Sequence, residues 1–174
     1  DLGAQWTLID LQAAGVTKFR AGSARTDDTV GVPDGHYADE SMKATVVPNR
    51  NAIMLSIACA LAISHSIGAV AFGAHTGDHP IYPDCRPEFI SAFEKMANLA
   101  TKAGVEGRTL LRIHTPLAKL GKADIVRLAA EVGVDFGSTH SCEHTDAEGR
   151  PCCAAVACLL PVLVCRGGGN SRTP

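Results

Sequence analysis

The chain has 174 residues, of which 46% are hydrophobic and 20% charged, and this size and composition predict a single domain with a buried core. Its formal net charge of −2 and its scattered Lys and Arg residues exclude a basic stripe, so neither a nucleic acid nor an anionic membrane is expected as a partner. No apolar run reaches the roughly 20 residues that span a bilayer, and the first residues lack the layout of a signal peptide, so we expect a cytoplasmic protein that acts on a small molecule.

The first half of the chain predicts a strand, a long loop, a helix and a second strand. Residues 8–11 are short and apolar, as in a strand, and residues 15–48 resemble a loop that is functional, mobile or disordered. From Asn51 onward apolar residues recur at helical spacing, and Gly68 is a natural helix stop. Residues 69–72, AVAF, suit a strand that is buried on both faces. The expected apolar face of the helix is Ile53, Met54, Ile57, Leu61 and Ala62.

The second half predicts a helix, a strand and another helix. Pro87 suits a first helical turn, and Lys102 and Gly104 are expected to mark the end of that helix. Residues 109–113, TLLRI, read as a strand, and residues 122–132 as a further helix. The expected apolar stripes are Phe89, Ile90, Phe93, Met96 and Ala97 on the first helix, and Ile125, Leu128, Ala129 and Val132 on the second.

Because strands and helices alternate, the predicted architecture is an α/β fold with a parallel sheet and right-handed crossovers. In open sheets of this kind, ligands bind beyond the carboxyl ends of the strands. Two polar stretches, residues 75–86 and 114–116, follow two of the predicted strands. We therefore expect a functional site where these stretches meet.

The loop TGDHPIYPDCR, residues 76–86, is dense in donors and acceptors that could bind a polar heterocycle and its carboxylate. The alternative is that its prolines stiffen a turn in which Asp84 caps the next helix. Cys85 could be a nucleophile, although a lone Cys is more often inert packing. The polar residues of this loop are Asp78, His79, Tyr82, Asp84, Cys85 and Arg86.

The segment VVPNRN, residues 46–51, places Arg50 just before a predicted helix. Its planar guanidinium could clamp a phosphate or carboxylate, or Arg50 could simply be solvated beside a helix-capping Asn49. The chain contains none of G-x-x-x-x-G-K-[ST], G-x-G-x-x-G and S-G-G-x-D-S, so it shows no phosphate-binding loop of its own.

A cysteine-rich segment, SCEHTDAEGRPCCAAVAC, occupies residues 141–158. Seven cysteines in all, an odd number, favour reduced thiols and a metal site over a disulfide framework. Cys142, Cys152 and Cys158 offer three thiolates for a tetrahedral Zn²⁺, and Ala155 stands where a C-x-x-C-x-x-C run would place another. His140, His144 or Cys153 is the possible fourth ligand.

Four motifs together closely resemble the 7-cyano-7-deazaguanine synthase family: VPNRN (47–51), GAHTGDHPIYPDCRPEF (73–89), IHTPLAKLGKADIVRLAAEVG (113–133) and the cysteine-rich tail. The resemblance implies a PP-loop ATP pyrophosphatase-like fold (adenine nucleotide alpha hydrolase-like), a homodimer and an ATP-dependent ligase of queuosine and 7-deazapurine biosynthesis. In that reaction ATP adenylates 7-carboxy-7-deazaguanine, ammonia displaces AMP to give an amide, and a second ATP activates the amide for dehydration to 7-cyano-7-deazaguanine (preQ0).

The resemblance also implies roles for particular residues. Catalytic roles fall to Arg50, Asp78 and Lys122, with Lys122 near the phosphates, and Mg²⁺ accompanies ATP. Zinc is the structural metal of the tail. The residues implied to bind substrate are Asn51, Tyr82, Asp84 and Arg86.

This sequence departs from the family pattern at its start and in its tail. The S-G-G-x-D-S loop that holds ATP in the family is missing, so the resemblance implies an N-terminally truncated copy, and whether that copy is active stays open at this point. A shifted reading frame near Pro151 and again after Leu160 would explain the altered tail. The expected organisation is an α/β domain at 1–141, a zinc-binding segment at 142–160 and a divergent tail at 161–174.

Two other functions remain open at this point. One is a non-catalytic protein that binds deazapurines or acts as a scaffold, and it would show deazapurine binding without ATP turnover. The other is a zinc-knuckle module for nucleic acid, against which the acidic balance and sparse aromatic residues argue.

Overall fold

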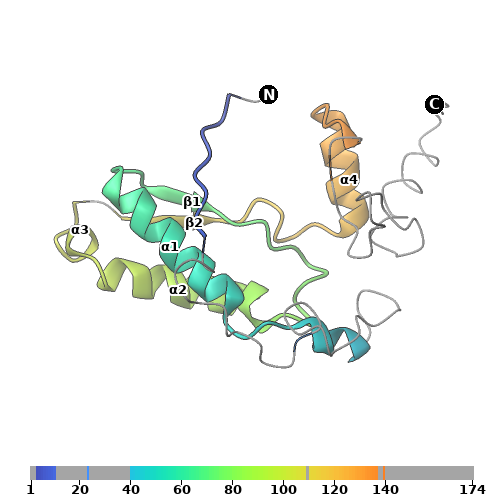
Figure 1. Ribbon diagram of the computed structural model, residues 1–174, viewed down its shortest axis with the longest axis horizontal. Coiled ribbons are helices and arrows are strands. Elements are labelled where there is room, and N and C mark those ends of the chain that lie inside the picture. The colour runs from blue at the N-terminus through green and yellow to red at the C-terminus, as the bar shows by residue number, and fades with distance from the viewer. Residues whose placement is uncertain (1–2, 11–22, 24–39, 109, 137–138, 140–174) are drawn as a thin grey trace.

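The computed structural model describes residues 3–10, 23, 40–108, 110–136 and 139. A 3-10 helix, η1 (Glu40–Thr45), comes before α1 (Arg50–Ser64) and β1 (Ala69–Ala71). A second 3-10 turn, η2 (Pro83–Cys85), then leads into α2 (Pro87–Leu99), α3 (Lys102–Val105), β2 (Arg112–His114) and α4 (Lys122–Glu131). Figure 1 shows α1, α2 and the two strands gathered in one body, with α4 standing apart from it.

Helix α1 confirms the helix predicted from Asn51, but its buried face differs from the predicted one. Met54 is 57% exposed, and Leu61 is also exposed. Because α1 carries apolar residues on most sides, periodicity could not select the face that packs on the sheet. The helix also ends before Gly68, since Ser66 adopts the left-handed conformation with φ 58°. Its buried residues are Asn51, Leu55, Cys59 and Ala62.

The stretch Met42–Ser64 is long and apolar enough, by length and composition alone, to cross a membrane. No such run was expected from the sequence. Core helices of soluble proteins meet the same criterion, so this is weak evidence of a membrane span. The stretch also changes direction at Asn49, whose φ is 55°, between the end of η1 and the start of α1. We therefore interpret α1 as a core helix.

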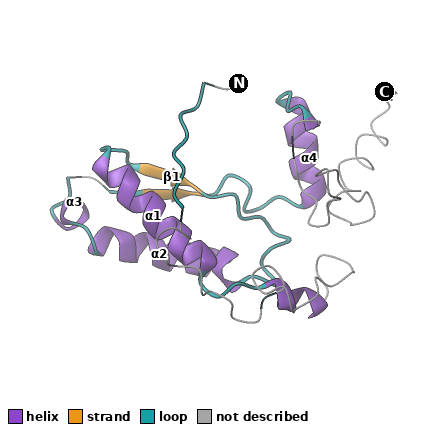
Figure 2. Cartoon of the chain, in the orientation of Figure 1, coloured by secondary structure: helices purple, strands orange, loops and turns teal. Residues whose placement is uncertain are grey.

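Strands β1 and β2 form a parallel two-stranded sheet in which Ala69 pairs with Arg112 and Ala71 pairs with His114 (Figure 2). The parallel sheet was predicted, whereas burial of both faces at 69–72 was wrong. Ala69 and Ala71 are exposed whereas Val70 is half-buried, so only one face of β1 is covered in the part of the chain that the structure describes.

Two other boundaries near the sheet also differ from prediction. The strand predicted at 109–113 begins only at Arg112, and Leu111, which is 1% exposed, precedes it. The strand predicted at 8–11 is absent from residues 3–10, since none of them pairs with β1 or β2. Most of the loop predicted at 15–48 lies outside the described residues, and η1 replaces its last part.

Helix α2 buries most of the predicted stripe, with Ile90, Phe93 and Ala97 in the core, while Met96 is exposed. It ends earlier than predicted. The hydroxyl of Thr101 accepts a hydrogen bond from Gly104 N at 3.3 Å and so caps the separate short helix α3.

Side chains of α2 satisfy the edge of β2 that faces away from β1. Glu94 Oε2 accepts a hydrogen bond from Ile113 N at 2.8 Å. Asn98 accepts one from Leu111 N and donates one to Leu111 O, both at 2.9 Å. Two side chains four positions apart on a helix thus provide the bonds that another strand would otherwise make.

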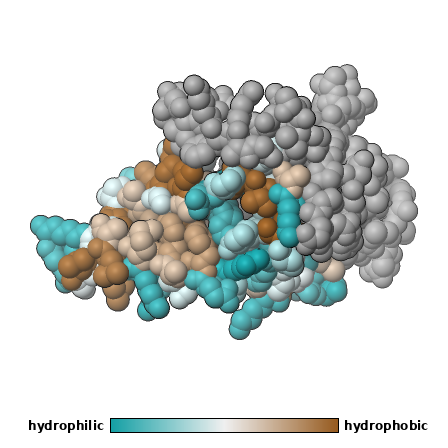
Figure 3. Space-filling view, turned by 90° about the horizontal axis from the view of Figure 1, so that it is seen from below, coloured by the Kyte–Doolittle hydropathy of each residue, from teal (hydrophilic) through white to brown (hydrophobic). Residues whose placement is uncertain are grey.

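Helix α4 confirms the helix predicted at 122–132, but not its buried side. Val126 is its buried residue, whereas Leu128 and Val132 are exposed, because α4 lies away from the sheet (Figure 1). Other apolar side chains are exposed at the opposite end of the molecule, near α3, where Figure 3 shows hydrophobic surface. They include Leu99 and Val105.

Candidate functional site

The loops that follow β1 and β2 lie side by side beyond the carboxyl ends of the strands. Phe72 N donates to His114 O at 2.8 Å, just after β1. Further on, the main-chain nitrogen and the hydroxyl of Thr76 both donate to Leu120 O, at 3.1 and 2.8 Å. The loops that carry the two polar stretches noted in the sequence are therefore joined by hydrogen bonds.

A buried histidine lies where these loops meet. His75 is 6% exposed, its Nδ1 accepts a hydrogen bond from Gly77 N at 3.0 Å, and its Nε2 lies 3.5 Å from Asp78 Oδ2. The same Asp78 oxygen accepts a hydrogen bond from His75 N at 3.1 Å. Burial lowers the pKa of His75, Asp78 opposes that shift, and the positive charge of Lys122 adds to it. Asp78 and Lys122, which are far apart in sequence, thus act on one imidazole.

The turn at Asp84 is bonded to the start of α1. Asp84 Oδ2 accepts a hydrogen bond from Asn51 N at 3.0 Å, and Asn51 Nδ2 donates to Cys85 Sγ at 3.2 Å. Asn49, at the N-cap position, makes no capping bond through its side chain, so Asp84 supplies an acceptor at this helix end. Asp84 therefore caps α1, where the sequence suggested that it might cap α2.

Cys85 is buried beside these groups. Burial, together with the negative charges of Asp78 and Asp84, raises the pKa of its thiol to about 12, against the opposing effects of Arg50 and of the hydrogen bond from Asn51. A thiol with this pKa is protonated at neutral pH, so it is a poor nucleophile. The packing interpretation of Cys85 is favoured.

Two more of the predicted residues are held by hydrogen bonds. Tyr82 is buried, and its hydroxyl lies 2.7 Å from Thr45 Oγ1, which connects the loop to η1. Arg86 is exposed, and its Nε donates to His79 O at 2.8 Å, which fixes the direction of the guanidinium. Only Nε of Arg86 is used in this contact.

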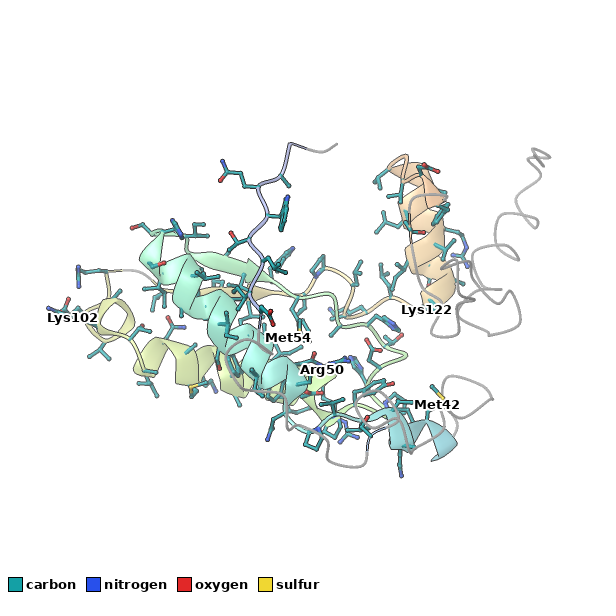
Figure 4. All side chains as sticks on the ribbon, viewed as in Figure 1. Met42, Arg50, Met54, Lys102 and Lys122 are labelled. Carbon is teal, nitrogen blue, oxygen red and sulfur yellow. The ribbon has the colours of Figure 1, made fainter. Side chains whose placement is uncertain are left out.

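Figure 4 shows Arg50 at the start of α1 and Lys122 at the start of α4, both on the side of the molecule beyond the strand ends, with Lys102 at the opposite end. The predicted residues thus come from three segments, which are the start of α1, the loop after β1 and the start of α4. Sequence reasoning did not single out the central position of His75 or the contact of Thr45 with Tyr82. A His followed three positions later by Asp, shortly after the apolar stretch at 69–72, was the available signal for His75.

The predicted zinc ligands Cys142, Cys152 and Cys158, like the segment boundaries at 142–160 and 161–174, lie outside the described residues. Among the residues with described positions, no group of three or more His, Cys, Asp or Glu side chains could hold a metal ion. Cys59 and Cys85, which are described, are both buried and free.

These contacts define an α/β protein of the open parallel-sheet class, with polar side chains gathered beyond the carboxyl ends of β1 and β2. The model of the family described as queuosine biosynthesis protein QueC matches residues 2–162. The chain therefore belongs to the QueC family, and the resemblance inferred from its motifs is confirmed.

Curated relatives named 7-cyano-7-deazaguanine synthase are about half identical to this chain. The protein from Frankia casuarinae is 48% identical over 139 residues, which are 80% of this chain and 58% of the relative. Those from Rhizobium rhizogenes and Thiobacillus denitrificans are 51% and 50% identical, with 81% and 80% of this chain and 57% and 61% of the relatives covered. The chain thus spans about three fifths of the length of these relatives.

Proposed function

We propose that this chain binds 7-carboxy-7-deazaguanine and takes part in its conversion to 7-cyano-7-deazaguanine, the product in its relatives' name. The single observation that carries the proposal is the clustering of the family's motif residues at one place. The start of α1, the loop after β1 and the start of α4 come together there through Asp84 and His75. A polar site beyond the strand ends is where an open parallel sheet binds its ligand.

The proposed roles follow from charge and position. Arg86 binds the substrate carboxylate through its terminal nitrogens, because Nε is already committed to His79 O. Arg50 and Lys122 stand at the starts of α1 and α4, and they stabilise the phosphate charge that develops when ATP is attacked. Asn51 and Tyr82 shape the wall of the deazapurine site, and Asp84 holds that wall to α1.

The proposed chemistry is an ATP-dependent carbon–nitrogen ligation in two stages. First, the substrate carboxylate attacks ATP and releases pyrophosphate, and ammonia then displaces AMP to give the amide. Next, the amide oxygen attacks a second ATP, again releasing pyrophosphate, and loss of AMP together with both amide N–H protons leaves the nitrile. Mg²⁺ accompanies each ATP. Asp78 keeps the His75 imidazole in place beside Lys122 during both stages.

Titration calorimetry with 7-carboxy-7-deazaguanine tests the binding part of this proposal. The unaltered chain should bind, and Arg86→Ala should weaken binding by about tenfold or more, since a charge-assisted contact is lost. Arg108→Ala is the matched control, because this exposed Arg pairs with Glu106 far along the sequence from the loop. If Arg86→Ala binds as well as the control, the role of Arg86 is wrong.

Mass spectrometry of the reaction with ATP and ammonia tests the catalytic part. The expected product is 7-cyano-7-deazaguanine, and Lys122→Ala should reduce its rate of formation by at least tenfold. Binding without any product would contradict the ligase role and favour a non-catalytic deazapurine-binding protein.

We further propose that the family's structural zinc is held by Cys142, Cys152 and Cys158, with His140, His144 or Cys153 as the fourth ligand. Metal analysis of the purified chain should find about one zinc per molecule, and much less would contradict the proposal. We also propose that the protein is a homodimer and that it is located in the cytoplasm. Sedimentation velocity tests the dimer.

A further inference from the structure

His79 carries an unusual buried atom. Its Nε2 is the one side-chain nitrogen or oxygen, among the residues whose placement is described, that is fully buried without a hydrogen-bond partner. Buried polar atoms in folded proteins nearly always have a partner, because burial removes their bonds to water. An unpaired imidazole nitrogen within the loop of the proposed site therefore needs an explanation.

The surroundings of His79 connect it to both parts of the site. Its main-chain oxygen accepts the hydrogen bond from Arg86 Nε at 2.8 Å. Its imidazole is close enough to His75 to contribute to the lowered pKa of that residue. Asp78, the preceding residue, is hydrogen-bonded to His75 N. His79 thus lies between the guanidinium proposed to bind the carboxylate and the cluster of His75, Asp78 and Lys122.

We propose that Nε2 of His79 forms a hydrogen bond with the polar ring edge of the bound deazapurine, and that this atom stays unpaired until the substrate arrives. The inference rests on the proposed function. A neutral imidazole nitrogen is a donor in one tautomer and an acceptor in the other, and a guanine-like ring edge offers partners of both kinds. A site with a buried group of this kind rejects ligands that cannot pair with it, so His79 contributes to specificity.

The proposed role of His79 predicts that its replacement weakens ligand binding without lowering stability. A histidine with a purely structural role would instead lower stability when it is replaced. If Nε2 is unpaired in the free protein, replacing His79 by Phe removes an unsatisfied polar atom and leaves stability unchanged or raised. The same replacement removes a bond to the ligand. His79→Gln is the conservative variant, because its amide nitrogen reaches about as far as the lost Nε2 and can restore the contact.

The experiment compares the full chain with His79→Phe, His79→Gln and the matched control His65→Phe, which alters an exposed His just after α1. Calorimetry with 7-carboxy-7-deazaguanine should show about tenfold weaker binding for His79→Phe and less than about threefold for His79→Gln. The thermal midpoint of ligand-free His79→Phe should equal or exceed that of the unaltered chain.

Three results would overturn the inference. Equal affinity of His79→Phe and the unaltered chain would do so and leave the proposed function standing. A drop in the ligand-free midpoint of His79→Phe beyond that of His65→Phe would show that Nε2 already has a partner, again without touching the proposed function. Failure of the unaltered chain to bind the deazapurine would remove both.

Discussion

The carboxylate of Asp84 reaches the first turn of a helix that lies 33 positions earlier in the sequence. The local pattern, Asp84 shortly before Pro87, suggested a cap for α2. In the structure, the N-cap position of α2 is Arg86, and Asp84 turns toward Asn51 instead. The sequence therefore correctly predicted that Asp84 caps a helix. It did not predict which helix, because the contact with α1 forms between segments that are far apart in the sequence.

Replacing Asp84 should destabilise the protein in a graded way. Asp84→Ala removes the acceptor for Asn51 N and should lower the free energy of unfolding by about 1–2 kcal/mol. Asp84→Asn keeps an acceptor oxygen without the charge, and about half that loss is expected. Urea denaturation measures both. Glu131→Ala, an exposed change at the end of α4, is the control and should stay within about 0.5 kcal/mol of the unaltered chain. Equal stability of all three variants would contradict the capping role.

Cys85 should make the protein less stable in alkaline solution. Its pKa rises from 9.0 to about 12 on folding, so above pH 9 the unfolded thiol loses its proton while the folded thiol keeps it. The folded state then binds more protons, and the free energy of unfolding falls as the pH rises from 9 toward 12. Denaturation at a series of pH values should show a shallower fall for Cys85→Ala than for the unaltered chain, and identical slopes would refute the shift.

The sheet and α2 depend on each other through side chains. The existence of α1, α2 and α4 was readable from apolar periodicity, and α2 buries most of its predicted stripe. The role of Glu94 and Asn98 could not be predicted from the sequence. Their hydrogen-bond partners are main-chain groups of residues 111 and 113, which come close to α2 only in the folded chain. The buried face of α1 was missed for a related reason, since its apolar residues surround the helix axis.

Removing the side chain of Asn98 should weaken the contact between α2 and the β2 edge of the sheet. Asn98→Ala leaves the nitrogen and oxygen of Leu111, a residue that is 1% exposed, without their bonds to α2. A loss of about 2–3 kcal/mol in the free energy of unfolding is expected. Lys95→Ala, an exposed change on the same helix, should cost less than about 0.5 kcal/mol. Chemical denaturation distinguishes the two, and similar losses would mean that the Asn98 bonds contribute little.

The site as a unit was only partly predictable. The density of polar residues at 76–86 and the polar end of the following strand pointed to the right edge of the sheet, because parallel strands place their carboxyl ends together. The placement of both Asp78 and Lys122 close enough to act on His75 required the actual fold, since Asp78 lies in the loop after β1 and Lys122 begins α4. Cys142, Cys152 and Cys158 lie outside the described residues, so their grouping stays a prediction.

The outer edge of β1 should promote self-association. Ala69 and Ala71 are exposed, and no strand in the described part of the chain pairs with the main-chain groups of β1 that face away from β2, so these groups offer a template for another strand. Ala69→Lys places a charge on that edge and should weaken association by about tenfold in sedimentation velocity over a range of concentrations. Ala100→Lys adds the same charge just after α2 and serves as control. If both variants associate alike, the contact lies elsewhere.

The hydrogen bonds from Glu94 and Asn98 to the edge of the sheet at β2 also determine at which edge a further strand could be added. One edge is occupied by side chains of the chain's own helix, and no strand among the described residues pairs with the other, so within this part of the chain a new strand can enter only beside β1. When two copies pair through β1, both outer edges of the joined sheet are already occupied, and no site is left for a third. Because α2 blocks the edge of β2, pairing through β1 would stop at two chains and would not continue into a fibre.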